Sequence, residues 1–223
     1  ANDNDMSIAE NHGGLYKNLK LLRETEGKAE CNLFKAMGLE YIFVKDGNSL
    51  EELIEVFKKV KDINHPIVVH ICTQKGKGYK LAEEDKEPWH YVMPFNIEDG
   101  KPLNEDVEDY CDITKEYLIK KMKEDKTVVT ITAGTPGNFG FSKRERDKLG
   151  SQFVDVGIAE QTAVAISSGM ASKGAKPVFT VVSSFIQRAY DQLSQDLCIN
   201  NNPATIVVSY GGAIGMTDVT HLG

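Results

Sequence analysis

Glu160 is the residue whose position most needs a chemical explanation. The stretch FVDVGIAEQTAVA (residues 153–165) begins as an apolar strand, turns at Gly157 and continues as a helix, and Glu160 lies at that turn. Burying an ionised carboxylate without a partner costs several kcal/mol. Either the end of the strand is open to water, with Glu160 in a first helical turn where the helix dipole favours an acid, or Glu160 has a chemical function.

Arg188 is a second charged residue in apolar surroundings. In SSFIQRAYDQ (residues 183–192) it shares a predicted helix with Phe185 and Ile186. A guanidinium in such a place needs a partner. A substrate phosphate would supply one through two parallel hydrogen bonds, whereas the competing interpretation is an internal ion pair with Asp191 or another acid.

Alternating strands and helices are expected to position these side chains. In the first half, YIFV (41–44) and IVVHIC (67–72) are β-branched or aromatic runs typical of buried strands. Between them, Ser49 and Glu52 form a predicted capping box for a helix over 49–61, whose apolar residues recur at helical spacing. Strand, helix and strand with short connections favour a parallel sheet.

The second half repeats this alternation after a charged, proline-containing stretch at 84–108, which we interpret as a linker. Helices are predicted at about 106–124, 160–173 and 185–199, and strands at TVVTITAG, FVDVGI, PVFTVV and TIVVSYGG. Ligands of such sheets bind beyond the carboxyl ends of the strands. Glycines are abundant there, in KGKGY, AGTPGNFG and YGGAIG, and they either admit a ligand close to the backbone or only form tight turns.

Composition narrows the function classes. The 223 residues are 41% hydrophobic and 26% charged, with a net charge of −7, which argues against a general nucleic-acid binder. The four cysteines are far apart and form no CxxC pair, which favours reduced, cytosolic thiols over a disulfide framework or a zinc site. We find no apolar run of about 18 residues and no signal peptide, so no membrane association is predicted.

Six stretches in one order identify a resemblance: NDNDMSI, KGKGY, EPWH, DVGIAEQTAV, SSFIQRAYDQ and THLG. Together they resemble the 1-deoxy-D-xylulose-5-phosphate synthases, thiamine-diphosphate enzymes of the transketolase superfamily. The resemblance implies two α/β domains of the thiamine-diphosphate-binding type, with mainly parallel sheets flanked by helices. Residues 1–95 correspond to the later part of the first domain, 96–109 to a linker and 110–223 to an incomplete second, pyrimidine-binding domain. The upstream Gly-Asp-Gly segment and the third domain are not in the sequence, so we expect a piece of a longer protein.

The resemblance also assigns cofactor residues. Glu160 is expected to hydrogen-bond the aminopyrimidine ring of thiamine diphosphate and so to help activate the cofactor. Asn4 and Met6 are expected to bind Mg²⁺, Met6 through its backbone carbonyl, although NDND read alone is only a polar turn. Tyr79 and Phe185 are expected beside the cofactor.

For the substrates, the resemblance implies pyruvate and glyceraldehyde 3-phosphate, converted to 1-deoxy-D-xylulose 5-phosphate, a precursor for isoprenoids and thiamine. His90 is expected to contact the acceptor, Arg188 to bind its phosphate, and His221 to handle protons as a catalytic residue. His90 and Glu160 are the other expected catalytic residues. A cytoplasmic homodimer is the family expectation.

Several positions depart from the family pattern, mostly on the substrate side. Thr217 stands where an Asp is expected, Val182 where a Tyr is usual, Thr162 where a His is usual and Gln74 where a Lys is common. Two alternatives therefore stay open: a transketolase-like enzyme that moves a ketol unit between sugar phosphates, and a non-catalytic relative that serves as an assembly subunit.

Overall fold

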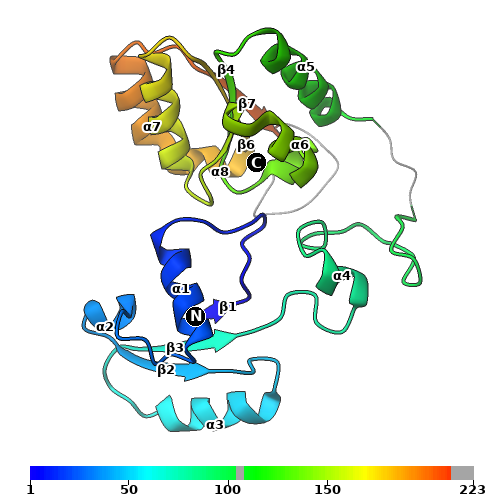
Figure 1. Ribbon diagram of the computed structural model, residues 1–223. Coiled ribbons are helices and arrows are strands. Elements are labelled where there is room, and N and C mark those ends of the chain that lie inside the picture. Colours follow the sequence, from blue (N-terminus) through cyan, green and yellow to red (C-terminus); the bar gives the residue numbers. More distant parts are fainter. Residues whose placement is uncertain (104–107, 212–223) are drawn as a thin grey trace. The chain divides into compact units, whose positions relative to one another are not determined.

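The computed structural model describes residues 1–103 and 108–211, and the chain divides into two compact units (Figure 1). Unit 1 is Ala1–Asn104 and unit 2 is Glu105–Gly223. Each unit contains a parallel sheet with helices, so the α/β fold class is confirmed.

Unit 1 is built on a three-stranded sheet in the order β1-β3-β2, with both strand pairs parallel. The strands are β1 (Asn2–Asp3), β2 (Glu40–Val44) and β3 (Ile67–Cys72). The helices are α1 (Gly14–Glu24), α2 (Leu33–Ala36), α3 (Leu50–Val60) and α4 (Lys80–Glu84). The predicted strand–helix–strand unit is β2, α3 and β3, and β3 lies in the centre of the sheet.

The start of α3 differs in detail from the predicted capping box. The Ser49 side chain accepts a hydrogen bond from the Glu52 backbone N–H at 3.3 Å, as predicted. The Glu52 carboxylate, however, accepts from the backbone N–H of Asp46, three residues before the cap. Only half of the box forms, because the Asp46 turn offers the carboxylate another donor.

The proline-containing stretch after α4 is more ordered than a plain linker. Trp89 and Phe95 pack against Tyr79, with ring centroids 4.9–5.7 Å apart within this trio. An antiparallel bridge joins Phe95 to Pro102. The pattern of charges and prolines missed this cluster because its rings come from positions that are not adjacent in the sequence.

Unit 2 is built on a four-stranded, wholly parallel sheet in the order β5-β4-β6-β7. Its strands are β4 (Val128–Thr132), β5 (Phe153–Asp155), β6 (Lys176–Val182) and β7 (Thr205–Ser209). Its longer helices are α5 (Tyr110–Glu124), α6 (Lys143–Leu149) and α7 (Glu160–Ala171). The main core lies between the sheet and α7 and includes Ile131, Val164 and Phe179.

Two helix predictions in unit 2 need correction. Helix α5 begins at Tyr110 and not near residue 106, because Asp109 caps it through a full capping box. The predicted helix over 185–199 is four short segments: α8 (Ser183–Ile186), the 3₁₀ turn η3 (Gln187–Ala189), α9 (Tyr190–Gln192) and the π-helix η4 (Leu193–Ile199). Across these segments Ala189 and Leu197 are buried in the core, whereas Arg188 stays on the surface.

No helix in the part of the chain that the structure describes combines the length and apolar composition that a membrane span requires.

Candidate functional site

The carboxyl ends of the four strands of unit 2 lie at one edge of the sheet, because all four strands are parallel. Glu160 follows β5 through a turn at Gly157, whose φ is +74°. Arg188 follows β6, and Tyr210 follows β7. This edge therefore gathers Glu160 and Arg188, whereas the predicted catalytic residue His221 lies outside the described residues.

Glu160 is the first residue of α7 and is only 2% exposed, so the open, solvated end that its position also allowed is not what the structure has. Its Oε2 atom lies 2.9 Å from Nη1 of Arg188, whose side chain is 49% exposed. The two groups form an ion pair but lack hydrogen-bond geometry, and Oε2 accepts no hydrogen bond from any described residue. The partner that Arg188 needs is thus an acid, as in the competing interpretation, but that acid is Glu160 and not Asp191.

Buried polar atoms without hydrogen bonds concentrate at this edge. Among the described residues, four buried side-chain N or O atoms lack a hydrogen-bond partner, and three of them are Thr132 Oγ1, Ser184 Oγ and Glu160 Oε2. Thr132 ends β4, Ser184 lies in the turn of helix after β6, and Glu160 follows β5. Buried polar groups normally have partners, so this edge has unused capacity to bind a polar ligand.

Asp155 shapes the same edge and was missed by the sequence reasoning. Its Oδ1 atom accepts hydrogen bonds from the backbone N–H groups of Gly134, at 2.8 Å, and Gly157, at 2.9 Å. The carboxylate thus ties the turn after β4 to the turn before α7. Gly134 has a φ of +79°, and a Cβ there would lie 3.0 Å from Ile158 Cγ1. The acid within the apolar run FVDV was the available signal.

The remaining predicted positions of unit 2 lie at different depths. Phe185 is partly buried and packs against the main core. Val182 is 1% exposed at the end of β6, and Thr162 is exposed on α7. Thr217 lies outside the described residues.

In unit 1, Asn4 and Met6 follow β1 at the carboxyl edge of its sheet. The Asn4 side-chain Oδ1 atom accepts a hydrogen bond from the Met6 backbone N–H at 3.1 Å. An amide oxygen has a second lone pair, and neutral oxygen donors of this kind suit Mg²⁺. The donor set at this turn therefore fits the predicted ion.

Lys75 joins two of the family stretches. Its Nζ atom donates to the Ser7 backbone carbonyl at 2.9 Å and lies 3.2 Å from Nδ1 of His90. Burial lowers the pKa of Lys75. The hydroxyl of Tyr79 donates to the Ile97 carbonyl at 3.0 Å, so Tyr79 is held within the aromatic trio described above. The structure thus brings His90 and the KGKGY loop together with the segment after Met6.

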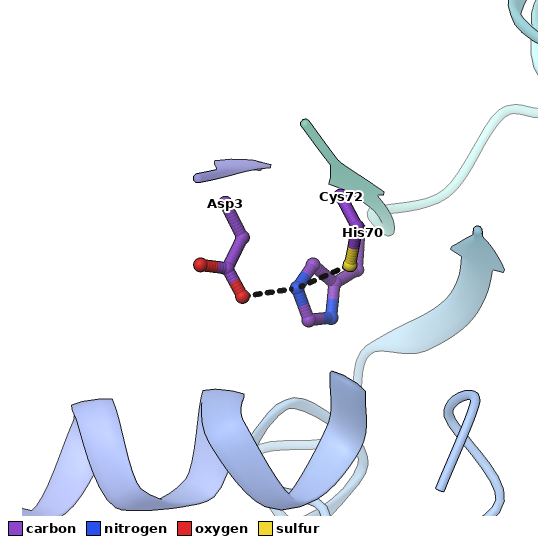
Figure 2. Close-up of side chains that lie close together, drawn as sticks. All are labelled: Asp3, His70 and Cys72. Carbon is purple, nitrogen blue, oxygen red and sulfur yellow. Dashed lines mark hydrogen bonds and ion pairs between the residues drawn. The ribbon is translucent and has the colours of Figure 1, made fainter. Parts of the chain in front are cut away.

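Asp3 is the centre of a buried network that the sequence reasoning did not anticipate. Its carboxylate lies 2.8 Å from Nε2 of His70 and accepts hydrogen bonds from Nη1 of Arg23 at 2.7 Å (Figure 2 shows the Asp3–His70 contact). Burial alone would raise the pKa of Asp3, but the hydrogen bonds from His70 and Arg23 outweigh burial and lower the pKa to about 2. The polar histidine in the β-branched run IVVHIC was the only sequence signal of this network.

Comparison with known families gives two matches. The family described as "Transketolase, pyrimidine binding domain" matches residues 108–221. The family described as "1-deoxy-D-xylulose-5-phosphate synthase" matches residues 25–73.

Curated relatives agree with these matches. The chain is 38% identical over 260 residues to the 1-deoxy-D-xylulose-5-phosphate synthase of Clostridium beijerinckii and 37% identical over 257 residues to that of Clostridium perfringens. Both matches cover 100% of this chain. The Acaryochloris marina synthase is 42% identical over 194 residues, which cover 86% of this chain and 30% of that protein. The chain spans 41% of the length of the two clostridial relatives.

One solved structure, described as "Split gene transketolase, inactive beta4 tetramer", aligns with 43% of this chain and 32% of its own, at 18% identity and a TM-score of 0.37. A similarity this low supports no structural conclusion.

Proposed function

The chain belongs to the transketolase pyrimidine-binding domain family, and from this premise we propose that the protein is a thiamine-diphosphate-dependent transferase. The observation that carries the proposal is the Glu160 carboxylate. It is buried at the carboxyl edge of a parallel sheet, and its Oε2 atom accepts no hydrogen bond from the described residues. A buried acceptor of this kind suits a ring N–H of a bound heterocycle.

The residues present fit the cofactor in two places. Glu160 would accept a hydrogen bond from the aminopyrimidine ring, and Phe185 would pack beside it. In unit 1, Asn4 and the Met6 carbonyl would bind Mg²⁺ on the diphosphate, and Tyr79 would lie near it. Thiamine diphosphate, when bound, supplies a carbon nucleophile that adds to a carbonyl and accepts the charge left by decarboxylation.

The protein's own contribution is orientation, charge and proton transfer. Glu160 fixes the orientation of the pyrimidine ring through the hydrogen bond it accepts. Arg188 supplies the positive charge that makes a buried Glu160 tolerable, and its exposed half is available for an anionic substrate group. His90 and His221 are proposed to exchange protons with substrate hydroxyl or carbonyl oxygens.

For the substrates, we propose pyruvate and glyceraldehyde 3-phosphate, with 1-deoxy-D-xylulose 5-phosphate as product. The support is the similarity to synthases of that name in three bacteria. The competing proposal is ketol transfer between sugar phosphates, which the changed substrate-side positions Val182 and Thr162 keep open. A non-catalytic role as an assembly subunit is the third. A cytoplasmic homodimer belongs to the same proposal by family similarity.

The test is calorimetric titration of the chain with thiamine diphosphate and Mg²⁺, followed by an assay of CO₂ release from pyruvate with glyceraldehyde 3-phosphate. Binding with pyruvate-dependent CO₂ release supports the synthase reaction. Binding with ketol transfer but without CO₂ release favours the transketolase-like reaction. No binding would contradict a cofactor site in this chain.

Glu160→Ala is expected to abolish turnover and leave the fold intact, because it removes the ring acceptor. The matched control is Glu116→Gln, which changes an exposed glutamate on α5 of the same unit. Substantial remaining activity in Glu160→Ala would show that another group activates the cofactor.

A further inference from the structure

Three side chains with metal-binding atoms lie on one face of the strand pair β1–β3. The two strands are parallel, and the Cα atoms of Asp3 and Cys72 are register partners. His70 lies two residues before Cys72 in β3, and alternate residues of a strand point to the same face. The register of the sheet, and not a local spacing of cysteines, therefore assembles a carboxylate, an imidazole and a thiol (Figure 2).

The three groups are close enough for one ion. The ligand atoms of Asp3, His70 and Cys72 all lie within 4.8 Å of one another. His70 Nε2 is 2.8 Å from Asp3 Oδ2 and 3.9 Å from Cys72 Sγ. A tetrahedral Zn²⁺ would need separations of about 3.4 Å between nitrogen and oxygen and about 3.6 Å between nitrogen and sulfur. Relative to the structure, the nitrogen–oxygen pair would open by about 0.6 Å and the nitrogen–sulfur pair would close by about 0.3 Å.

We propose that Asp3, His70 and Cys72 bind a zinc ion, with a fourth position left for water. Thiolate and imidazole ligands favour Zn²⁺ over Mg²⁺ or Ca²⁺. The ligand chemistry therefore separates this site from the Mg²⁺ proposed at Asn4 and Met6, which rests on oxygen atoms alone.

The groups around the three ligands are those that a metal site needs. The Tyr41 hydroxyl lies 2.7 Å from His70 Nδ1 and fixes the orientation of the ring. The Nη1 atom of Arg23 donates hydrogen bonds to both oxygens of the Asp3 carboxylate, each at 2.7 Å. Such partners of metal ligands orient them and tune their affinity. His70 and Asp3 are buried, whereas Cys72 is partly exposed.

The local charge also accommodates a divalent cation. Arg23 pairs with both Asp3 and Asp5, so two carboxylates face one guanidinium and leave a surplus negative charge. Burial and the nearby Asp3 raise the pKa of Cys72 to about 11, so the thiol carries its proton when no metal is bound. Metal binding would release the thiol proton to solvent, and the neutral His70 imidazole would carry its one proton on Nδ1, where the Tyr41 hydroxyl oxygen can accept it, so that Nε2 is free to bind the ion.

The competing account is a hydrogen-bond network without a metal, in which the His70 ring only links Tyr41 to Asp3. Titration of the whole chain with Co²⁺, a spectroscopic substitute for Zn²⁺, distinguishes the two accounts. We expect about one equivalent to bind, with a thiolate-to-cobalt charge-transfer band in the near ultraviolet and the strong visible bands of tetrahedral coordination, both lost when Zn²⁺ is added.

Cys72→Ala is expected to remove the charge-transfer band and to weaken Zn²⁺ binding by at least about 100-fold, because even residues that only support a metal ligand are worth about 10- to 100-fold in affinity. The matched control is Cys111→Ala, since Cys111 is also partly buried and burial also raises the pKa of its thiol to about 11. Far-ultraviolet circular dichroism verifies that each variant folds.

Three outcomes would overturn the proposal: no charge-transfer band at saturating Co²⁺, a band that survives Cys72→Ala, or an equal loss in Cys111→Ala. Should Cys72→Ala fail to fold, Cys72→Ser provides the second test, because a hydroxyl cannot give the sulfur-to-cobalt band. None of these measurements needs thiamine diphosphate or substrate, so they are independent of the proposed transferase activity.

Discussion

Replacing Arg188 with alanine is expected to destabilise unit 2, because it leaves the buried carboxylate of Glu160 without its cation. Glu160 is 2% exposed, and its Oε2 atom lies 2.9 Å from Arg188 Nη1. Unit charges at that separation interact by about 6 kcal/mol at an effective dielectric constant of about 20. The Arg188 side chain is 49% exposed, however, so water screens the pair strongly.

The expected loss of unfolding free energy is therefore about 2 kcal/mol, above the value typical of exposed ion pairs and below that of fully buried ones. For a chain of this size, that loss lowers Tm by roughly 4–8 °C. Glu160→Gln alone should cost less, because the Arg188 guanidinium it leaves behind can be hydrated. In the Arg188→Ala background, Glu160→Gln removes the unpaired buried charge and should restore part of the lost stability.

Thermal and urea unfolding of the two single variants and the double variant, followed by far-ultraviolet circular dichroism, complete a double-mutant cycle. We expect a coupling free energy of about 1–2 kcal/mol. Arg144→Ala is the control, since Arg144 is an exposed arginine on α6 of the same unit, and its effect should stay within about 0.5 kcal/mol. If the effects of Arg188→Ala and Glu160→Gln are additive, the ion pair does not stabilise the fold and the reasoning is refuted.

Three further predictions follow from individual contacts. Arg188→Ala should raise the KM for a phosphorylated acceptor more than it lowers kcat, and steady-state kinetics with an unchanged KM would remove Arg188 from the acceptor site. Asp125 accepts hydrogen bonds from the Lys176 ammonium and from Thr127, which lower the pKa of Asp125. The stabilising effect of Asp125 is therefore present above the ordinary Asp pKa and is lost as the pH falls. Asp125→Asn should flatten the acid side of a Tm-versus-pH curve, and an unchanged curve would contradict this. Gln152 is buried and donates to three backbone carbonyls at 2.8–3.1 Å, so Gln152→Ala should cost about 2–3 kcal/mol in urea unfolding, against little change for the exposed Gln195→Ala.

The alternation of strands and helices could be predicted because the spacing of apolar residues within each segment indicates its secondary structure. β-Branched runs of about five residues and apolar residues at helical spacing report on their own segments alone. That information sufficed for the parallel sheets and for placing Glu160 at the junction of β5 and α7. The prediction from periodicity was wrong over residues 185–199. Apolar residues at helical spacing predicted one α-helix there, whereas the structure has short segments of different helix type.

Side-chain partners could not be predicted in the same way. The sequence indicated that Arg188 needs a partner and offered Asp191, three residues away, whereas the structure pairs it with Glu160 from a different strand–helix junction. Likewise, the spacing of the cysteines argued against a zinc site, because the sequence contains no CxxC pair. The group Asp3, His70 and Cys72 is brought together by the register of β1 and β3.

Sequence alone indicates the α/β alternation, the family resemblance and the position of an acid at the end of a strand. Only the fold shows that this acid is buried with an oxygen that accepts no hydrogen bond from the described residues, and that Asp3 meets His70 at a sequence separation of 67 residues. The physical reason is that secondary structure follows from neighbouring residues, whereas partners and burial follow from strand register and from packing between distant segments.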